Sequence, residues 1–419
     1  MAETNPLDPY AGNLLTQGLG PIRSRSEVLK ALTELPRRPR SMECIPPHIA
    51  LHHLMSLRDF HIASLEECRL HETIDLMIRQ NYRYLDPTTS STWTTISGEH
   101  LSPLPAKAPA FGAAVVGHSG TGKTEAILRC LRSYPQQVIH HGTFPRLIGG
   151  HKQVAWLSIN VPPSGRAADL ATDLMREWDR VTGGNRFAAD LAKDRRDGMK
   201  MLDSWRQVAT SHFLGLLHLD EVQNLFKLST LKSRRNKSEV QELSIVEDQF
   251  LKWILILMNT WHVPLLISGT PDGIGALTRR LSTTERIVTS GYHVFQHFDD
   301  PKDPSFRTIF LDQLGKYQYV QKKLPIDDDL AALIIDLTGG IQRLIIALWI
   351  AAHRVALERN KGDLLPSDFK KAASTYLAAV GPAVAAFRSK DPAMMGKYED
   401  LVPRNDAFWS QLWNSIARA

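Results

Sequence analysis

The segment Gly117-His-Ser-Gly-Thr-Gly-Lys-Thr124 constrains this chain more than any other stretch of its sequence. It follows a short apolar run, residues 111–116, and precedes a helix-compatible stretch, which is the context that a G-x-x-x-x-G-K-[ST] phosphate-binding loop requires. Glycines let backbone N–H groups point inward around phosphate oxygens, and the N-terminus of the following helix adds a positive dipole. The segment therefore predicts a nucleotide site, and the alternative is a plain glycine turn between a strand and a helix.

The loop predicts a role for each of its residues. Lys123 is expected to reach the β- and γ-phosphates as a point charge, and so to act in catalysis as well, while the Thr124 hydroxyl is expected to bind Mg²⁺. ATP and Mg²⁺ are therefore the expected cofactors. The expected nucleotide-binding residues are Gly117, His118, Ser119, Gly120, Thr121, Gly122, Lys123, Thr124 and Glu125.

Two carboxylates end a second apolar strand. Asp220 and Glu221 directly follow the run Leu-Leu-His-Leu at residues 216–219. Asp220 is expected to hold Mg²⁺ through water, and Glu221 to polarise the attacking water. The alternative is an acidic pair that caps a helix.

Small polar residues end two further strands. Residues 265–272, Leu-Leu-Ile-Ser-Gly-Thr-Pro-Asp, offer Ser268 or Thr270 as a hydrogen-bond partner for the γ-phosphate or its attacking water, with Thr270 taken as a catalytic candidate. A strand-to-turn transition explains part of this pattern. Asn160 ends the strand at residues 154–159, where we expect it to hold Glu221 away from catalysis until a ligand binds.

Arginines are candidates for contacts with phosphate. Arg279, Arg280 or Arg286 is expected to reach the γ-phosphate of a neighbouring subunit, although exposed arginines on helices are ordinarily solvated charges. Arg343 lies in the first turn of a helix that follows Thr338-Gly-Gly. A cation is unfavourable there because of the helix dipole, so we expect Arg343 to contact the nucleotide.

A basic segment follows the two carboxylates. Residues 227–238 hold no acidic side chain and five basic ones, which are Lys227, Lys232, Arg234, Arg235 and Lys237. Clustered Lys and Arg beside Ser and Thr suit contact with a DNA backbone without base readout. A solvated charge run is the equally weighted alternative. Arg166 is the next candidate for a DNA contact.

Composition narrows the class of protein. A hydrophobic content of 43% and a charged content of 22% are those of an ordinary soluble globular chain, and the net charge of +6 favours anionic partners. Three cysteines without a CxxC pair fit a reducing cytoplasm. The N-terminus is not a signal peptide, and polar residues interrupt the most apolar window, residues 250–269, so no membrane partner is expected.

Potential metal ligands gather near the N-terminus, but they match no standard zinc spacing, so no metal site is expected there. They are Cys44, His48, His52, His53, Cys68 and His71.

Hydrophobic periodicity predicts a loose arm at residues 1–23, helices within residues 24–83, and then alternating strands and helices. Strands are expected over residues 113–116, 137–140, 154–159, 213–219, 264–267 and 292–295. Helices are expected over residues 122–133, 167–181, 187–211, 239–261 and 274–281, and after the last strand over 304–322, 327–337, 341–359 and 366–379. This alternation predicts a parallel sheet with helices on both faces. The expected domains are an N-terminal arm and helical extension (1–100), a nucleotide-binding core (101–300), a helical lid (301–380) and a tail (381–419).

These motifs together resemble those of AAA+ ATPases of the ASCE class of P-loop NTPases, and more narrowly those of the TnsC/TniB family of ATP-dependent regulators of DDE transposition. The similarity covers roughly residues 74–379. Its most specific part is VIHH at residues 138–141, then WLSINVPPSG at residues 156–165, then DEVQNL at residues 220–225.

The resemblance implies an ATP-driven homo-oligomer, a ring or a filament, that assembles on duplex DNA without sequence preference in a bacterial cytoplasm, on the nucleoid. A target-selection protein would recruit it, and it would recruit and activate the transposase. One alternative is a replication initiator or helicase loader, which would carry a C-terminal winged helix. Another is a nucleotide-switched signalling scaffold of the STAND type, which would carry long repeats or an effector domain.

Overall fold

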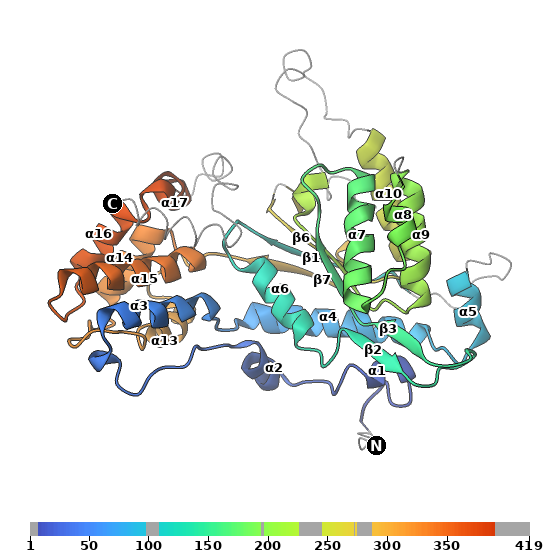
Figure 1. Ribbon diagram of the computed structural model, residues 1–419, viewed down its shortest axis with the longest axis horizontal. Helices are drawn as coiled ribbons and strands as arrows, with labels where there is room; N and C mark the ends of the chain where they lie inside the picture. Colours follow the sequence, from blue (N-terminus) through green and yellow to red (C-terminus); the bar gives the residue numbers. More distant parts are fainter. Residues whose placement is uncertain are drawn as a thin grey trace, which may run out of the picture. The chain divides into compact units, whose positions relative to one another are not determined.

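The computed structural model describes residues 7–97, 109–193, 197–225, 245–271, 273–274 and 287–389. Its centre is a five-stranded parallel sheet with the strand order β4-β5-β6-β1-β7 (Figure 1). The strands are β1 (Gly112–Gly117), β4 (Leu157–Asn160), β5 (Leu217–Asp220), β6 (Leu265–Gly269) and β7 (Gly291–Phe295). The strand that ends in Asp220 is thus separated from the phosphate-loop strand by β6, as in an ASCE-type P-loop fold. Because the strands are parallel, their carboxyl ends, where the candidate site residues lie, share one edge of the sheet.

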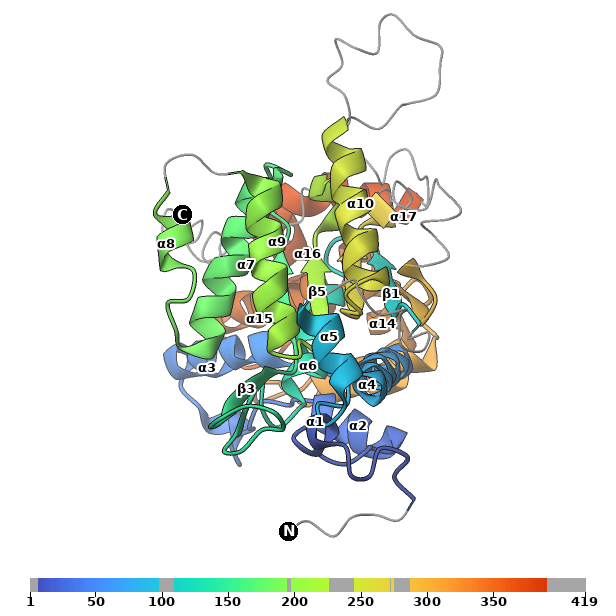
Figure 2. The same cartoon turned by 90° about the vertical axis from the view of Figure 1, so that its right-hand side faces the viewer.

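Helices cover both faces of the sheet, which explains why β1, β5 and β6 are buried along their whole length. On one face lie α7 (Ala167–Thr182), α9 (Gly198–Ser211) and α10 (Ile245–Asn259), and Figure 2 shows α7 and α9 side by side. Trp178 and Trp205 pack edge to face between α7 and α9, with ring centroids 6.4 Å apart. On the opposite face lie α4 (Leu65–Tyr84) and α6 (Lys123–Arg132) (Figure 1). The predicted fold class, a P-loop α/β sheet with helical extensions, is confirmed.

One predicted strand lies outside the main sheet, and another is broken. Strand β2 (Val138–His141) pairs antiparallel with β3 (His151–Val154) in a separate two-stranded sheet. The single strand expected over residues 154–159 is divided into β3 and β4, because the backbone turns between two partners: the N–H of Val154 bonds to His212 O, and that of Ala155 bonds to Gln137 O. Periodicity carries no information about such a change of partner.

Three predicted helices were also wrong in extent. The helix expected over residues 187–211 is divided into α8 (Ala188–Leu191) and α9, since Asp197 caps α9 by accepting from the N–H groups of Met199 and Lys200. The helix expected over 304–322 is a π-helix (Ser305–Leu311) followed by α13 (Asp312–Leu314). The last predicted helix ends early, as α16 (Pro366–Thr375), and α17 (Gly381–Ser389) follows in the segment expected to be a tail.

The described part of the expected loose arm, residues 7–23, is instead docked. It forms a short helix, α1 (Leu14–Gln17), whose Leu15 is fully buried. The Asn13 side chain donates to Tyr82 O at 2.8 Å, and Gln153 Nε2 donates to Leu15 O at 2.9 Å. Two long-range hydrogen bonds and a buried leucine therefore hold a segment whose polar composition gave no sign of packing.

The chain forms two compact units, each assembled from separated stretches of sequence. For the described residues, the first unit draws on Met1–Val28, Glu66–Val116 and Thr124–Val294, and the second on Leu29–Leu65, Gly117–Lys123 and Phe295–Ala419. The first unit contains the sheet and the docked N-terminal segment.

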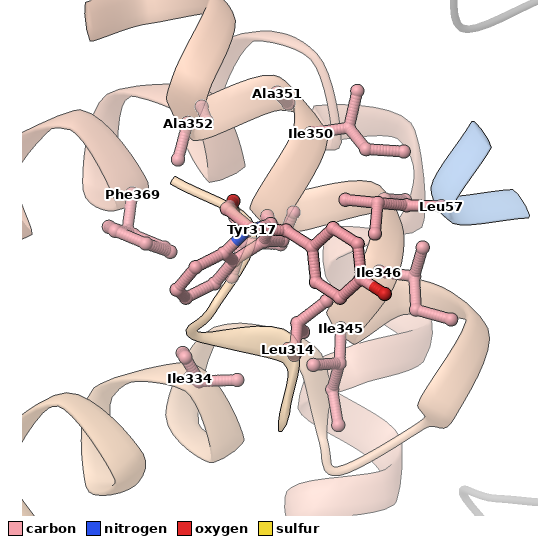
Figure 3. Packing of buried hydrophobic residues seen from close by; sticks show 14 of the residues in the cluster. Leu57, Leu314, Tyr317, Ile334, Ile345, Ile346, Ile350, Ala351, Ala352 and Phe369 are labelled. Atoms are coloured by element: carbon pink, nitrogen blue, oxygen red, sulfur yellow. Dashed lines mark hydrogen bonds between the residues drawn. The ribbon is translucent and has the colours of Figure 1, made fainter. Parts of the chain in front are cut away.

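The second unit is helical, and its core surrounds α15 (Gln342–Arg359) (Figure 3). Trp349 of α15 is fully buried, and its indole N–H donates to Tyr317 O at 3.0 Å. Other helices that contribute to this core are α3 (Pro47–Met55), the π-helix, α13, α14 (Asp328–Thr338), α16 and α17. No single described helix has the length and apolarity to cross a membrane, and the α14–α15 pair, which meets that test jointly, is bent by 111°.

The docking of the N-terminal segment predicts a stability difference between two leucines. Leu15→Ala should lower the free energy of unfolding by about 2 to 5 kcal/mol, because it opens a cavity in a packed site. Leu7→Ala is the matched control, since Leu7 is 86% exposed and its truncation should cost almost nothing. Urea unfolding followed by circular dichroism measures both, and equal stabilities would contradict the docking.

Candidate nucleotide site

The phosphate-binding loop, residues 117–123, is a tight turn that depends on its glycines. Gly120 and Gly122 have φ angles of 84° and 89°, a region that favours glycine. The Thr121 hydroxyl donates to His118 O at 2.8 Å, across the turn. A side chain on Gly117 would place its Cβ only 2.4 Å from Phe295 O. The motif's glycines thus meet both conformational and steric requirements of this turn.

Lys123 begins α6 and folds back over the loop. Its side chain is only 9% exposed, and its ammonium donates to Gly117 O and, at 2.9 Å, to His118 O. The ammonium therefore lies against two carbonyl oxygens of the loop.

The His118 side chain lies among aromatic rings of the second unit. Its ring centroid is 5.5 Å from that of Phe387 and 6.5 Å from that of His297. His297 and Phe387 also line a cavity of about 220 Å³. A cavity of the second unit is therefore bordered by the two rings that contact His118.

Asp220 is a buried carboxylate of the first unit. It ends β5, is 2% exposed, and accepts a 2.6 Å hydrogen bond from the Thr124 hydroxyl through Oδ2. Its Oδ1 accepts from the Ser268 hydroxyl at 2.5 Å and from the N–H of Glu221 at 2.9 Å. The predicted pair of magnesium ligands, Thr124 and Asp220, is thus in direct contact.

The backbone of Glu221 is strained, and its carboxylate accepts a hydrogen bond from a nearby side chain. Its φ of 60° lies in the left-handed region, which is uncommon for a residue with a side chain and is concentrated at functional sites. The side-chain N–H of Gln223 donates to Glu221 Oε2, and the side-chain carbonyl of Gln223 accepts from the N–H of Thr270 at 3.3 Å. Gln223 therefore joins Glu221 to the end of β6. Sequence inspection missed it, because nothing distinguishes this glutamine from a surface residue.

Asn160, which was expected to restrain Glu221, is exposed at the end of β4, where Asp220 is its register partner. Thr270 is 5% exposed, and its hydroxyl accepts from the N–H of Gly273 at 3.4 Å. The other β6 candidate, Ser268, is fully buried and donates its hydroxyl proton to Asp220. Thr270 is thus the candidate nearer the end of the strand.

A histidine that the sequence patterns did not single out stands behind Ser268. His218 of β5 is fully buried, with Nε2 2.8 Å from Ser268 Oγ and Nδ1 2.8 Å from Ser158 Oγ. Burial lowers the pKa of His218 to about 4, and the nearby Asp220 carboxylate offsets this only in part. The only sequence signal was a polar residue in the middle of an otherwise apolar strand.

The remaining predicted residues are placed as follows. Glu125 forms an ion pair with Arg129 one helical turn away, at 2.7 Å. Arg343 is half-buried in the first turn of α15, and Arg166 is exposed at the N-cap of α7. The proposed trans-acting arginines and the basic segment lie outside the described residues; they are Arg279, Arg280 and Arg286, and Lys227, Lys232, Arg234, Arg235 and Lys237.

The N-terminal histidines and cysteines are arranged without a metal-binding cluster. Within the described ranges, no three His, Cys, Asp or Glu residues are grouped to hold a metal ion. Cys44 is exposed, and His71 Nε2 is 3.1 Å from Ser133 Oγ.

The steric requirement at Gly117 predicts the effect of one methyl group. Gly117→Ala should weaken binding of a fluorescent ATP analogue about tenfold or more, because a cost of about 1.4 kcal/mol in the bound loop is already worth tenfold. Gly142→Ala is the matched control, since a Cβ there meets nothing within 4 Å. Equal affinities in a fluorescence titration would show that the close approach to Phe295 O does not matter.

Comparison with known proteins agrees with this geometry. Residues 112–277, which run from the start of β1 past the end of β6, match the family model described as AAA domain. A search among curated proteins found no match to the chain. The residues of the match include the phosphate-binding loop, Thr124, Asp220 and Glu221. The domain match and the P-loop α/β fold together support an ATPase of the AAA+ class.

Proposed function

We propose that the chain binds ATP at the phosphate-binding loop and hydrolyses it. The observation that carries this is the 2.6 Å hydrogen bond between Thr124 and Asp220, which joins the residue after the loop to the end of β5. A hydroxyl and a carboxylate are oxygen donors, the type that Mg²⁺ prefers, so the donor set fits this ion. Mg²⁺ would neutralise charge that develops on the phosphates.

Lys123, Glu221 and Thr270 would then have separate roles in the reaction. Lys123 would contribute a fixed positive charge to the β- and γ-phosphates in place of the two loop carbonyls that its ammonium now contacts. Glu221 would accept a proton from the attacking water or orient it. Its carboxylate is held by Gln223, so turnover requires that hydrogen bond to break or shift. Thr270, whose N–H donates to the same glutamine, would report a change at the phosphate to Glu221.

Two substitutions separate binding from turnover. Lys123→Ala should abolish ATP binding, because the charge at the loop is lost, and Glu221→Gln should bind ATP but not hydrolyse it. Isothermal titration calorimetry and phosphate release measure the two steps. Lys200→Ala and Glu72→Gln, which change exposed side chains, are the matched controls. Wild-type phosphate release by Lys123→Ala would refute the assignment.

We further propose that ATP controls an oligomer on duplex DNA in DDE transposition. The support is the sequence resemblance to TnsC/TniB-type regulators together with the basic segment. That segment follows Leu225, the end of a short 3-10 helix (Val222–Leu225) that begins just after Glu221. A change at Glu221 and Gln223 is therefore only a few residues from the DNA contact. In this proposal a target-selection protein recruits the oligomer to nucleoid DNA, the oligomer recruits the transposase, and one of Arg279, Arg280 and Arg286 completes a neighbour's ATP site.

The DNA proposal predicts how salt affects binding. Changing Lys232, Arg234, Arg235 and Lys237 to Gln should weaken binding to all duplexes alike. The slope of log affinity against log salt should fall by roughly 0.9 per phosphate contact removed. ATP affinity should not change. Fluorescence anisotropy with two unrelated duplexes, in saturating ATP, measures this.

A charge-matched control changes four exposed lysines to Gln, namely Lys200, Lys316, Lys370 and Lys371. It should leave the salt slope near the wild-type value. If neutralising the basic segment leaves the slope unchanged, that segment does not contact DNA, and Arg166 is the next residue to test.

A further inference from the structure

A line of hydrogen-bonded polar side chains crosses three adjacent strands of the sheet. It runs from Ser158 on β4 to His218 on β5, to Ser268 on β6, and back to Asp220 at the end of β5. Consecutive partners are 2.8, 2.8 and 2.5 Å apart. His218 and Ser268 are fully buried, and Asp220 is 2% exposed. The line ends at the carboxylate that contacts Thr124.

The direction of each hydrogen bond follows from the carboxylate. An ionised carboxylate only accepts, so the proton between Ser268 and Asp220 belongs to the Ser268 hydroxyl. Because that hydroxyl has only one proton, Ser268 Oγ must accept from His218, which places a proton on Nε2. His218 Nδ1 is then an acceptor, and the Ser158 hydroxyl donates to it. All three donors point toward Asp220.

A buried imidazole in an apolar strand costs free energy unless both ring nitrogens are paired. Here both are, and the neighbouring residues Leu217 and Leu219 are fully buried. A leucine at position 218 would match this environment without needing any partner. The role of His218 is therefore to be sought at Asp220, where the line ends, because a buried polar network with all its hydrogen bonds satisfied rigidifies a site.

We propose that Ser268 and His218 are positioning residues that fix the Asp220 carboxylate with Oδ2 toward Thr124, with Ser158 setting the tautomer of His218. The proposal deepens the proposed ATPase function and rests on it. Ser268 occupies Oδ1, so Asp220 cannot rotate without losing two hydrogen bonds to that oxygen. Partners that orient a metal ligand in this way typically change metal affinity about 10- to 100-fold when removed.

The first test compares nucleotide affinity with and without the metal. A non-hydrolysable ATP analogue is titrated calorimetrically in MgCl₂ and in EDTA. Ser268→Ala should reduce the gain in affinity that Mg²⁺ provides by about tenfold or more, while the affinity in EDTA stays at the wild-type value. Ser268→Cys, which keeps the volume but donates weakly, should give an intermediate loss.

Thr210→Val is the matched control for these variants. Thr210 is 7% exposed in α9, and its hydroxyl donates to Arg206 O of the same helix at 3.0 Å. This variant also loses a buried hydroxyl, so it reports the effect of a purely structural loss. Its gain from Mg²⁺ should equal that of the wild type.

The second test measures the tautomer without any nucleotide. In protein labelled with ¹⁵N-histidine, long-range ¹H–¹⁵N correlation spectra should show His218 with its proton on Nε2, identified by the signal missing in His218→Asn. Ser158→Ala should leave a mixture of the two tautomers. The wild-type spectrum requires no activity, so it separates the geometry of the line from the function proposed for the chain.

Two results would overturn the proposal. One is a proton on Nδ1 of His218 in the wild type, and the other is a Ser268→Ala variant that gains as much from Mg²⁺ as Thr210→Val does. A wild-type chain that binds no nucleotide would refute the proposed ATPase, and with it the positioning role. The Nε2–H tautomer in that same protein would show that the hydrogen-bond line itself is correct.

Discussion

The 2.6 Å hydrogen bond from Thr124 to Asp220 is the interaction on which the candidate site depends. It joins the first turn of α6 to the end of β5, two segments that are 96 residues apart in sequence. The bond exists only because the chain brings β5 beside β6 and β6 beside β1 in one parallel sheet. The sheet is thus what brings Thr124 into contact with a carboxylate that is distant in sequence.

Strand order gives β6 a second role. Strand β6 lies between β1 and β5. Residues at and just after its end therefore contact both Asp220 and Gln223. Ser268 holds Asp220 from within the sheet, and the N–H of Thr270 contacts Gln223 at its edge. In the proposed function Ser268 would orient Asp220, whereas Thr270 contacts Gln223, the residue that donates to Glu221.

Local patterns were sufficient for much of the fold, and two of the failures have a common cause. The apolar run before Gly117 and the glycine pattern predicted β1, the loop and α6 closely, since each depends on neighbours in sequence. The strand expected at residues 137–140 pairs outside the main sheet, and the described part of the arm at residues 1–23 is docked rather than loose. Their structures depend on Val154 and Gln153, which lie farther along the chain. A pattern of polar and apolar residues carries no information about which distant residues a segment contacts.

The same division applies to the site. The sequence by itself identified the phosphate-binding loop, Thr124, Asp220 and Glu221 as candidates, because phosphate and magnesium chemistry require these residue types at fixed places near strand ends. Only the tertiary structure decided what holds them. Ser268 and His218 make their hydrogen bonds between strands, and Gln223 joins Glu221 to the N–H of Thr270. These partners cannot be read from the sequence. Hydrogen bonds need partners within about 3 Å, and only the folded chain sets those distances.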